Sequence, residues 1–306
     1  NNTFQIYEKA APIGQETYKR SDRLSSFINL EPRLSLAYTL ADDNSIKVSY
    51  NRMAQYLHLI SNTSSPTPLD VWTPSGPYVE PQLLNQYALG YYQDFKDNTF
   101  SLETELFYKS IDNRIDYIDG ADLIANNAIE QVILNGEAKA YGLEILLRKN
   151  LGRLTGWLAY TLSKSEQRTP GRNATESGIN GGQWYSTPYD KIHDISVSAS
   201  YELNKKWSFN SNFIFQTGQP TNYPVGQFDL KGLVVPIYGN RNKQRLPSYN
   251  RLDLSATLIP DKNKDRKWQA EWVFGIYNVY NRHNAASINF SQNRDTGVNE
   301  AVQTSI

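Results

Sequence analysis

The side chains best suited to catalysis are few and lie far apart in the sequence. The only histidines are His58, His193 and His283, each in a different segment, and there is no cysteine. No HExxH, GxSxG or P-loop pattern is present, and the lack of Cys excludes a thiol nucleophile, a Cys-ligated zinc site and an iron–sulfur cluster. Glu103 and Glu105 share one strand face about 7 Å apart, whereas the paired carboxylates of glycosidases usually come from different strands. We therefore predict no enzymatic activity, and no feature requires a metal or a cofactor.

Two other groups of residues could carry function. Charged side chains recur at alternate positions of several segments. Their simplest role is to form hydrogen bonds with one another and with water along a solvent-facing surface. Aromatic residues in Pro-, Gly- and Asn-rich segments could instead stack against sugars, peptides or chelates, or pack loop against loop. The charged candidates are Arg33, Glu103, Glu105, Glu144, Arg148 and Asp253, and the aromatic candidates are Trp72, Tyr78, Trp184 and Tyr185.

The elements that position these residues are alternating strands. Five pairs of alternating runs flank short polar turns, which predicts β-hairpins. The predicted strands are 31–40 with 45–51, 83–95 with 99–109, 137–149 with 154–166, 191–203 with 207–217, and 249–258 with 268–279. Their apolar positions are expected to share one face, namely Leu34, Leu36, Ile46, Val48, Leu102, Leu106, Leu143, Ile145, Ile195 and Val197.

The lengths of strands and connections favour a membrane barrel. Links within hairpins are short, whereas the links at about 55–82, 110–136, 167–190 and 218–247 are long. Outer-membrane barrels have short turns at one rim and long loops at the other. Strands of ten to thirteen residues, tilted near 45°, rise about 25–30 Å and span the apolar band. We therefore predict an all-β, antiparallel, up-and-down transmembrane barrel architecture with about ten strands.

Overall composition is consistent with this prediction. The mean hydropathy is −0.59, but a barrel alternates lipid-facing and lumen-facing residues and so averages out polar. Lys and Arg number 31, as do Asp and Glu, which argues against a nucleic-acid partner. Two other classes stay open, a passive outer-membrane porin and a soluble β-sandwich that binds carbohydrate.

Six segments resemble a known family. They are EPRLSLAY (31–38), SYNRMAQYLHLISNTSSPTPLDVWTPS (49–75), EAKAYGLEILLRKNLGRLTGWLAYTLSKSE (137–166), YDKIHDISVSASYELNKKWSFNSNFIFQTGQPTNYPVG (189–226), RLPSYNRLDLSAT (245–257) and WVFGIYNVYNRHNA (272–285). Each is weak alone, but in this order they are similar to the carboxy-terminal part of the barrel of TonB-dependent outer-membrane receptors. The similarity is to the Bacteroidetes type, which carries a carboxypeptidase-like regulatory domain.

The resemblance implies a location and partners. Residues 1–306 would form wall and extracellular loops of a 22-stranded outer-membrane barrel that imports a scarce nutrient, such as an iron chelate, a glycan or a peptide. The partners would be the plug domain of the same full-length chain, TonB through its amino-terminal part, and the lipid bilayer, with a surface lipoprotein left open. The charged candidates would then face the lumen and hold the plug.

The resemblance also implies missing parts. The TonB box, the plug, the first half of the barrel and the closing strand have no counterpart among these 306 residues. We therefore expect a sheet that does not close on itself and leaves two strand edges free. Asn278 and Asn281 in YNVYN are expected to have a structural role at a strand end, where Asn tolerates turn geometry.

Overall fold

The computed structural model describes residues 2–8, 11–19, 23–60, 71–121, 131–231, 233–260, 268, 270–293 and 299–305. The strands before the centre of the chain are β1 (Asn2–Glu8), β2 (Ala11–Tyr18), β3 (Arg33–Ala41), β4 (Asn44–Gln55), β5 (Leu57–Ile60), β6 (Val71–Pro74), β7 (Gln82–Phe95), β8 (Phe100–Tyr117), β9 (Ile133–Lys149) and β10 (Leu154–Arg168). After the short 3₁₀ helix η2 (Ile179–Gly182) come β11 (Tyr185–Ser186), β12 (His193–Glu202), β13 (Trp207–Gln216), β14 (Pro220–Thr221), β15 (Pro224–Leu230), β16 (Leu233–Tyr238), β17 (Gln244–Arg245), β18 (Tyr249–Leu258), β19 (Trp272–Ile276), β20 (Ala285–Gln292) and β21 (Asn299–Ser305). None of the helical turns in these ranges is long and apolar enough to cross a membrane.

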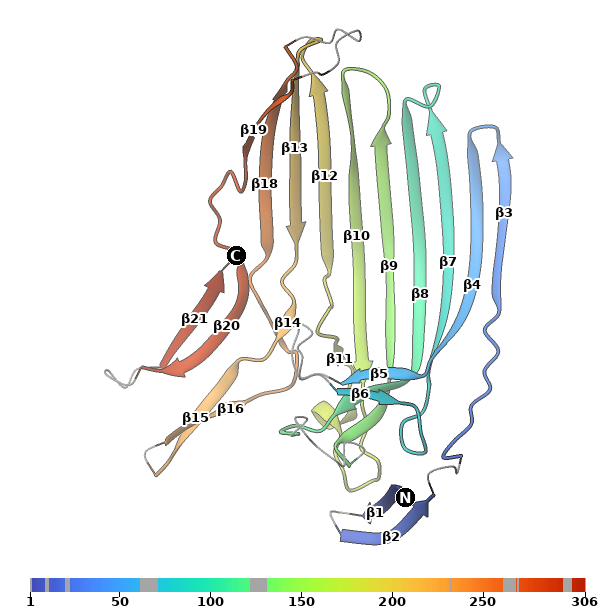
Figure 1. The fold of residues 1–306 in the computed structure, drawn as a ribbon, viewed down its shortest axis with the longest axis vertical. Helices are drawn as coiled ribbons and strands as arrows, with labels where there is room; N and C mark the ends of the chain where they lie inside the picture. Colours follow the sequence, from blue (N-terminus) through green and yellow to red (C-terminus); the bar gives the residue numbers. More distant parts are fainter. Residues whose placement is uncertain are drawn as a thin grey trace.

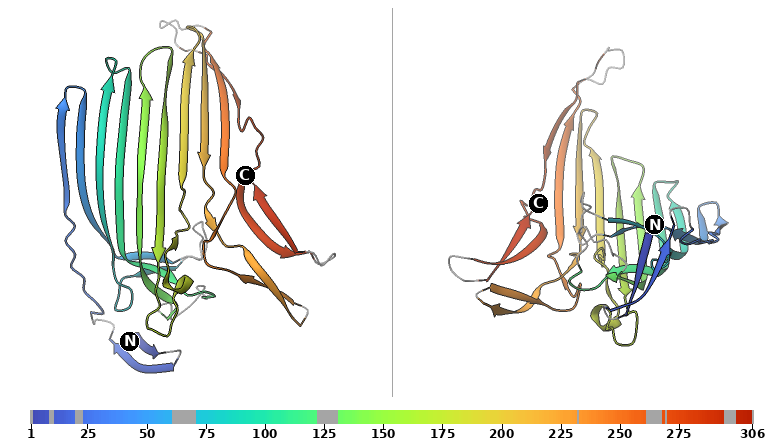
Figure 2. Two further views of the ribbon diagram at one scale, coloured as in Figure 1. Left: turned by 180° about the vertical axis from the view of Figure 1, so that it is seen from behind. Right: turned by 60° about the horizontal axis from the view of Figure 1, so that its bottom comes forward.

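One large antiparallel sheet dominates the molecule. Its order is β19-β18-β13-β12-β10-β9-β8-β7-β4-β3, with β11 paired to β10. The neighbours are the five predicted hairpins joined side by side, so the predicted meander is confirmed. Figures 1 and 2 show these strands as a single curved layer. The pairs β1–β2, β5–β6, β14–β17, β15–β16 and β20–β21 form separate two-stranded sheets.

Short turns and long connections lie at opposite ends of the sheet. The turns after β3, β7, β9 and β12 lie along the upper rim in Figure 1, and the long segments after β4, β8, β10 and β13 lie at the lower end. The predicted turn at 260–267 falls almost entirely outside the described residues. β8 and β9 extend further toward the long-loop end than we predicted. The predicted strands end early because a bulge in β8 interrupts the alternation of apolar and polar residues there.

The register separates the side chains into two faces. All ten predicted apolar positions align in cross-strand rows on one face, for example Leu36↔Val48↔Leu89↔Leu106↔Leu143↔Leu162. We call this the apolar face and its opposite the polar face. Leu36 is 71 % exposed, Val48 50 % and Leu106 53 %, so no second sheet covers these described residues as it would in a sandwich.

Aromatic rows bound the apolar face at both ends. Toward the long loops, Tyr50, Tyr87, Tyr108 and Tyr141 stand directly opposite one another on β4, β7, β8 and β9. Toward the short turns lie Tyr201 and Phe209, and then Trp207 and Trp272. On β10 the face runs from Leu154 to Lys164, ten steps of about 3.3 Å, which rise about 25 Å at a tilt near 40°. This height matches the apolar band of an outer-membrane barrel.

The sheet is open within the described residues. β3 and β19 lie at opposite ends of the strand order. The expected absence of a ladder between the first and last strands is therefore confirmed for this part of the chain.

Candidate functional site at the long-loop end

A bulge in β8 determines which side chains face inward at the long-loop end. Asn113 lies at a register shift between Asp112 and Arg114, with a left-handed φ of 58°. The extra residue reverses the alternation, so Arg114 and Asp116 join the polar face while Ile115 and Tyr117 join the apolar one. Asn tolerates this backbone conformation, and its side-chain amide donates to the carbonyl of Pro81 at 3.0 Å.

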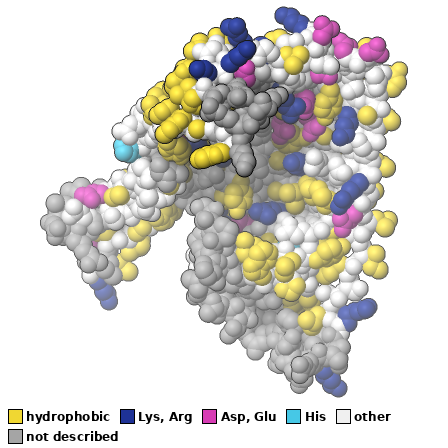
Figure 3. Space-filling view, turned by 45° about the horizontal axis from the view of Figure 1, so that its top comes forward, with side chains coloured by type: hydrophobic (Ala, Val, Ile, Leu, Met, Phe, Trp, Pro, Cys, Tyr) yellow, Lys and Arg dark blue, Asp and Glu magenta, His cyan; other side chains and the backbone are white. Residues whose placement is uncertain are grey.

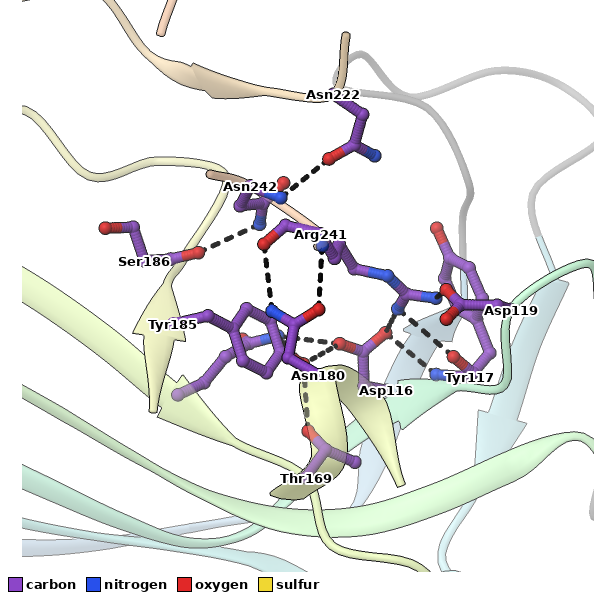
Figure 4. A network of polar contacts seen from close by, with 11 residues as sticks. Asp116, Tyr117, Asp119, Thr169, Asn180, Tyr185, Ser186, Asn222, Arg241 and Asn242 are labelled. Atoms are coloured by element: carbon purple, nitrogen blue, oxygen red, sulfur yellow. Dashed lines mark hydrogen bonds and ion pairs between the residues drawn. The ribbon is translucent and has the colours of Figure 1, made fainter. Parts of the chain in front are cut away.

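The centre of the site is an ion pair between distant segments. The Arg241 guanidinium lies in the connection between β16 and β17, and its Nη1 donates to Oδ1 of Asp116 at 2.7 Å. Nη1 also donates to the carbonyl of Tyr117 at 3.1 Å, and Nη2 pairs with the carboxylate of Asp119. Figure 4 shows this guanidinium held between the two aspartates. The side chains of Arg241 and Asp116 are only 12 % and 9 % exposed, so neither charge is fully hydrated.

The second oxygen of Asp116 contacts both the end of β10 and the segment after it. Its Oδ2 accepts from Nε2 of Gln167 at 2.7 Å and from the hydroxyl of Tyr185 at 2.5 Å. The Tyr185 hydroxyl also lies 3.0 Å from Oγ1 of Thr169. Burial, and then the charge of Asp116, raise the pKa of Tyr185, so the phenol stays protonated and remains a donor. We call Asp116, Asp119, Gln167, Tyr185 and Arg241 the Arg241 cluster.

Asparagine side chains hold the backbone around Arg241. Asn180, at the 3₁₀ turn, donates to the carbonyl of Arg241 at 3.0 Å and accepts from its amide at 2.7 Å. Asn242 donates to the carbonyl of Ser186 at 2.9 Å, and its own amide donates to Asn222 Oδ1 at 2.6 Å. The connection is therefore fixed at the backbone level as well as through its charge.

A second ion pair fastens the same long connection nearby. The carboxylate of Asp190 is fully buried, accepts from the amide of Ser165 at 2.6 Å and pairs with Nη2 of Arg245. Arg245 Nη1 also donates to the carbonyls of Asp190 and Gly218, at 3.1 and 3.0 Å. The segment between β13 and β18 is thus tied at two points, to the end of β8 through Asp116 and to the segment before β12 through Asp190.

His58 forms a third polar contact, in the β5–β6 hairpin. It is 2 % exposed, with Nδ1 accepting from Nε2 of Gln82 at 2.9 Å and Nε2 lying 2.9 Å from Oγ of Ser75. Nη1 of Arg114 donates to Oε1 of the same Gln82 amide at 3.4 Å. Burial, and then the charge of Arg114, lower the pKa of His58, so the imidazole is neutral and docks the hairpin by hydrogen bonds.

The four predicted aromatic residues do not converge on one point. Trp72 on β6 is 60 % exposed and Tyr78 is 37 % exposed, and both lie in the segment between β4 and β7. Tyr185 is 6 % exposed and belongs to the Arg241 cluster. Its neighbour Trp184 lies on the apolar face instead, with Lys139 Nζ 4.1 Å and Arg168 Cζ 5.3 Å from the ring centroid. Ligand contact by these four side chains stays a prediction.

The six predicted charged residues all belong to the polar face. Arg148 pairs with Glu103, and Glu105 stands directly opposite Glu144 on the neighbouring strand. Asp253 accepts from Nε of Arg251 at 3.0 Å and from the amide of Asn278 at 2.9 Å, while Arg33 lies on the edge strand β3. Figure 3, seen over the short-turn rim, shows Lys, Arg, Asp and Glu side chains inside the bend of the sheet and hydrophobic ones along its outer margin.

The structural role expected for the asparagines of YNVYN is confirmed. Asn278 and Asn281 have φ values of 51° and 49°, the left-handed region that Asn tolerates. Asn278 Oδ1 accepts from the amide of Arg282 at 3.1 Å, and its Nδ2 donates to the carbonyl of Arg282 at 3.0 Å.

Sequence reasoning missed the Arg241 cluster, the Asp190–Arg245 pair and the His58 contacts. The available signal was weak: acidic residues in IDYIDG (115–120) and basic ones in GNRNKQR (239–245), both in long inter-hairpin segments. Nothing in the one-dimensional pattern pairs positions more than 120 residues apart. No group of three or more His, Asp or Glu side chains is placed to hold a metal among the described residues.

The comparisons with known proteins agree with this architecture. Residues 15–279 match the family model described as TonB dependent receptor-like, beta-barrel. Among solved structures, the siderophore receptor PiuA from Acinetobacter baumannii is 16 % identical with a TM-score of 0.59, and the alignment covers 92 % of this chain and 35 % of that one. The ferric-catecholate import receptor Fiu from E. coli K12 is 17 % identical with a TM-score of 0.57, covering 84 % and 31 %.

The ferripyoverdine receptor of Pseudomonas aeruginosa is 14 % identical with a TM-score of 0.57, covering 84 % of this chain and 30 % of that one. The chain thus spans about a third of the length of these structures. A search of curated protein sequences finds no match.

Proposed function

The chain belongs to the TonB-dependent receptor family, as part of its β-barrel domain, and from this membership we propose that it forms wall and extracellular loops of an energy-coupled outer-membrane import receptor. The observation that carries the proposal is the division of one sheet into an exposed apolar face, bounded by aromatic rows, and a charged opposite face. In a bilayer the first would contact lipid and the second would line a lumen.

The carboxylates of the polar face support a plug inside this lumen. Glu105 and Glu144 stand directly opposite each other, where Cβ atoms are about 4.5–5.5 Å apart, so two negative charges repel. Neither forms an ion pair with another described residue of the wall. A cationic side chain supplied by a plug domain of the full-length chain would neutralise both. Arg33, Glu103, Arg148 and Asp253 would extend this contact surface along the wall.

The contact between wall and plug can be tested in the full-length receptor. We expect Glu105→Gln combined with Glu144→Gln to loosen the plug and raise the entry of vancomycin, which is too large for ordinary porins, without changing receptor abundance. Glu137→Gln, on the apolar face beyond the tyrosine row, is the matched control. Equal antibiotic entry with the double variant and the control would count against a plug contact at this pair.

The cargo would be bound at the long-loop end. Exposed Trp72 and Tyr78 offer stacking surfaces there, and the Arg241 cluster joins the long connections after β8, β10 and β13 at the same end. Two neighbours of the same fold are a ferric-catecholate import receptor and a siderophore receptor, which makes an iron chelate one candidate beside a glycan or a peptide. The six sequence motifs support the Bacteroidetes type with its regulatory domain, and the reading frame upstream of Asn1 tests that assignment.

Uptake measurements decide between active import and passive diffusion. Cells that express the full-length receptor would be given an iron-55 catecholate complex, a labelled oligosaccharide or a labelled peptide, with and without TonB. Uptake of one of these that disappears without TonB supports the proposal. Uptake that persists without TonB would instead identify a passive porin.

A further inference from the structure

Lysine side chains follow the tyrosine row on the apolar face. Lys164 on β10 stands directly opposite Tyr141, and Lys139 lies one side-chain step further toward the long loops. On the membrane side of the same row lie Leu143 and Leu162, which are apolar. The face therefore changes from hydrocarbon-compatible to cationic within two residues, at the depth where tyrosine marks a bilayer interface.

Trp184 joins the two lysines from a different segment. Tyr185 and Ser186 pair with Gln167 and Glu166 of β10, which places Trp184 beside Arg168 on the apolar face. Its ring centroid lies 4.1 Å from Nζ of Lys139, a cation–π distance. Tryptophan favours the membrane–water interface because its ring is apolar and its N–H is polar.

The lysines share one carboxylate between them. Glu166 lies 3.5 Å from Nζ of Lys139 and 3.7 Å from Nζ of Lys164, so the trio carries a net charge of about +1. The two ammonium-bearing side chains are 28 % and 34 % exposed. On the same face, Arg52 of β4 lies in the row of Lys139, and one step further out Arg168 pairs with Glu137 at 3.0 Å and Asp112 stands opposite Glu137. The positive charge is therefore concentrated next to the tyrosine row.

We propose that Lys139, Lys164 and Trp184 form a binding site for the phosphorylated headgroup of an outer-leaflet lipid. The ammonium groups would donate to phosphate oxygens, Trp184 would cover the glycerol or sugar, and the leucine rows would receive the acyl chains. The site rests on the proposed membrane location, but it assigns Trp184 to lipid rather than to cargo.

The test compares two double variants of the full-length receptor in detergent. Lys139→Gln with Lys164→Gln removes the site, and Lys47→Gln with Lys109→Gln removes the same charge from the polar face of the same sheet. Bis-phosphorylated lipid A is the probe, dephosphorylated lipid A is the reference, and native mass spectrometry reads the bound lipid. We expect the first variant to bind the phosphorylated probe roughly tenfold more weakly and the reference unchanged, whereas the second matches wild type.

Equal losses in both double variants, or an equal loss for both lipids, would overturn the headgroup site. Trp184→Ala should weaken the phosphorylated probe without altering cargo uptake. If Trp184→Ala abolishes cargo uptake and leaves lipid binding unchanged, Trp184 belongs to the cargo site and not to the lipid site. Heat-modifiable migration reports insertion separately. A receptor without heat-modifiable migration would refute the proposed membrane function itself. A correctly inserted Lys139→Gln, Lys164→Gln receptor that binds the phosphorylated lipid as wild type does would refute only this site.

Discussion

At the scale of single residues, the long-loop end depends on charges that are removed from water. Arg241 and Asp116 are both largely buried, and each has several hydrogen-bond partners besides the other. Removing one member of such a pair leaves an uncompensated charge, whereas the pair itself adds less than its proximity suggests. The cluster is therefore better understood as a device that fixes loop positions than as a source of global stability.

Arg241→Gln should free the connection between β13 and β18. We expect local destabilisation of about 3 kcal/mol, because Asp116 would stay buried without its cation. Limited proteolysis within residues 218–247 should accelerate, with little change in the heat-modifiability midpoint of the barrel. Arg172→Gln is the control, since Arg172 pairs with Glu176 at a surface where its side chain is 48 % exposed. Similar proteolysis of both variants would contradict the role of the cluster.

His58 should make the β5–β6 hairpin sensitive to acid. Its pKa in the folded protein is lowered from the usual value of about 6.5 by burial and then by Arg114. Its neutral form therefore contributes full stability above about pH 6.5, and this contribution is lost as the pH falls toward the folded value. The protection factors of the amides at residues 57–60 and 71–74, which correct for the intrinsic effect of pH on amide exchange, should fall between pH 7.5 and 5.

His58→Asn should abolish this pH dependence at the hairpin. Protection factors that fall equally with acid in the wild type and in the variant would show that another group is responsible.

At the scale of elements, the period of two decides the environment of each side chain. Leu146 and Leu147 are chemically identical and adjacent, yet the register puts Leu147 opposite Leu102 and Leu158 on the apolar face and Leu146 opposite Glu103 on the polar face. The Asn113 bulge follows the same rule. One inserted residue moves every later side chain of β8 to the opposite face of the sheet.

This pair of leucines gives an internally controlled test. Leu147→Arg should destabilise the full-length receptor by about 2–4 kcal/mol, because it places a charge near the middle of the lipid-facing band. Leu146→Arg should be tolerated, because the new guanidinium can reach Glu103 and water. Urea titration of the reconstituted receptor measures both, and equal losses would reject the assignment of faces.

At the scale of the whole molecule, the antiparallel meander fixes sidedness. The described short turns of the large sheet all fall at one rim, so its long connections emerge at the other (Figure 1). These 306 residues contain no cysteine, which simplifies a labelling experiment. In intact cells that express the full-length receptor, Asn173→Cys should react with a membrane-impermeant maleimide and Leu151→Cys should not. Both should react after lysis, and labelling of Leu151→Cys in intact cells would reverse the orientation.

The sequence by itself determined the ten long strands of the large sheet, their pairing and their faces. Alternation is a local property, and short turns pair neighbouring strands, so the local pattern alone was enough to place residues such as Leu36 and Val48 on a common face. The charged positions followed from the same alternation, including Glu105 beside Glu144.

Only the tertiary structure decided how the long connections fold over the sheet. Arg241 meets Asp116 across 125 positions, and the adjacent Trp184 and Tyr185 separate to opposite faces because β11 pairs with β10. Neither fact has a local signature. Contacts between loops depend on where the ends of distant strands lie in space. The face on which a side chain of a strand lies depends only on local alternation and on the neighbouring strands.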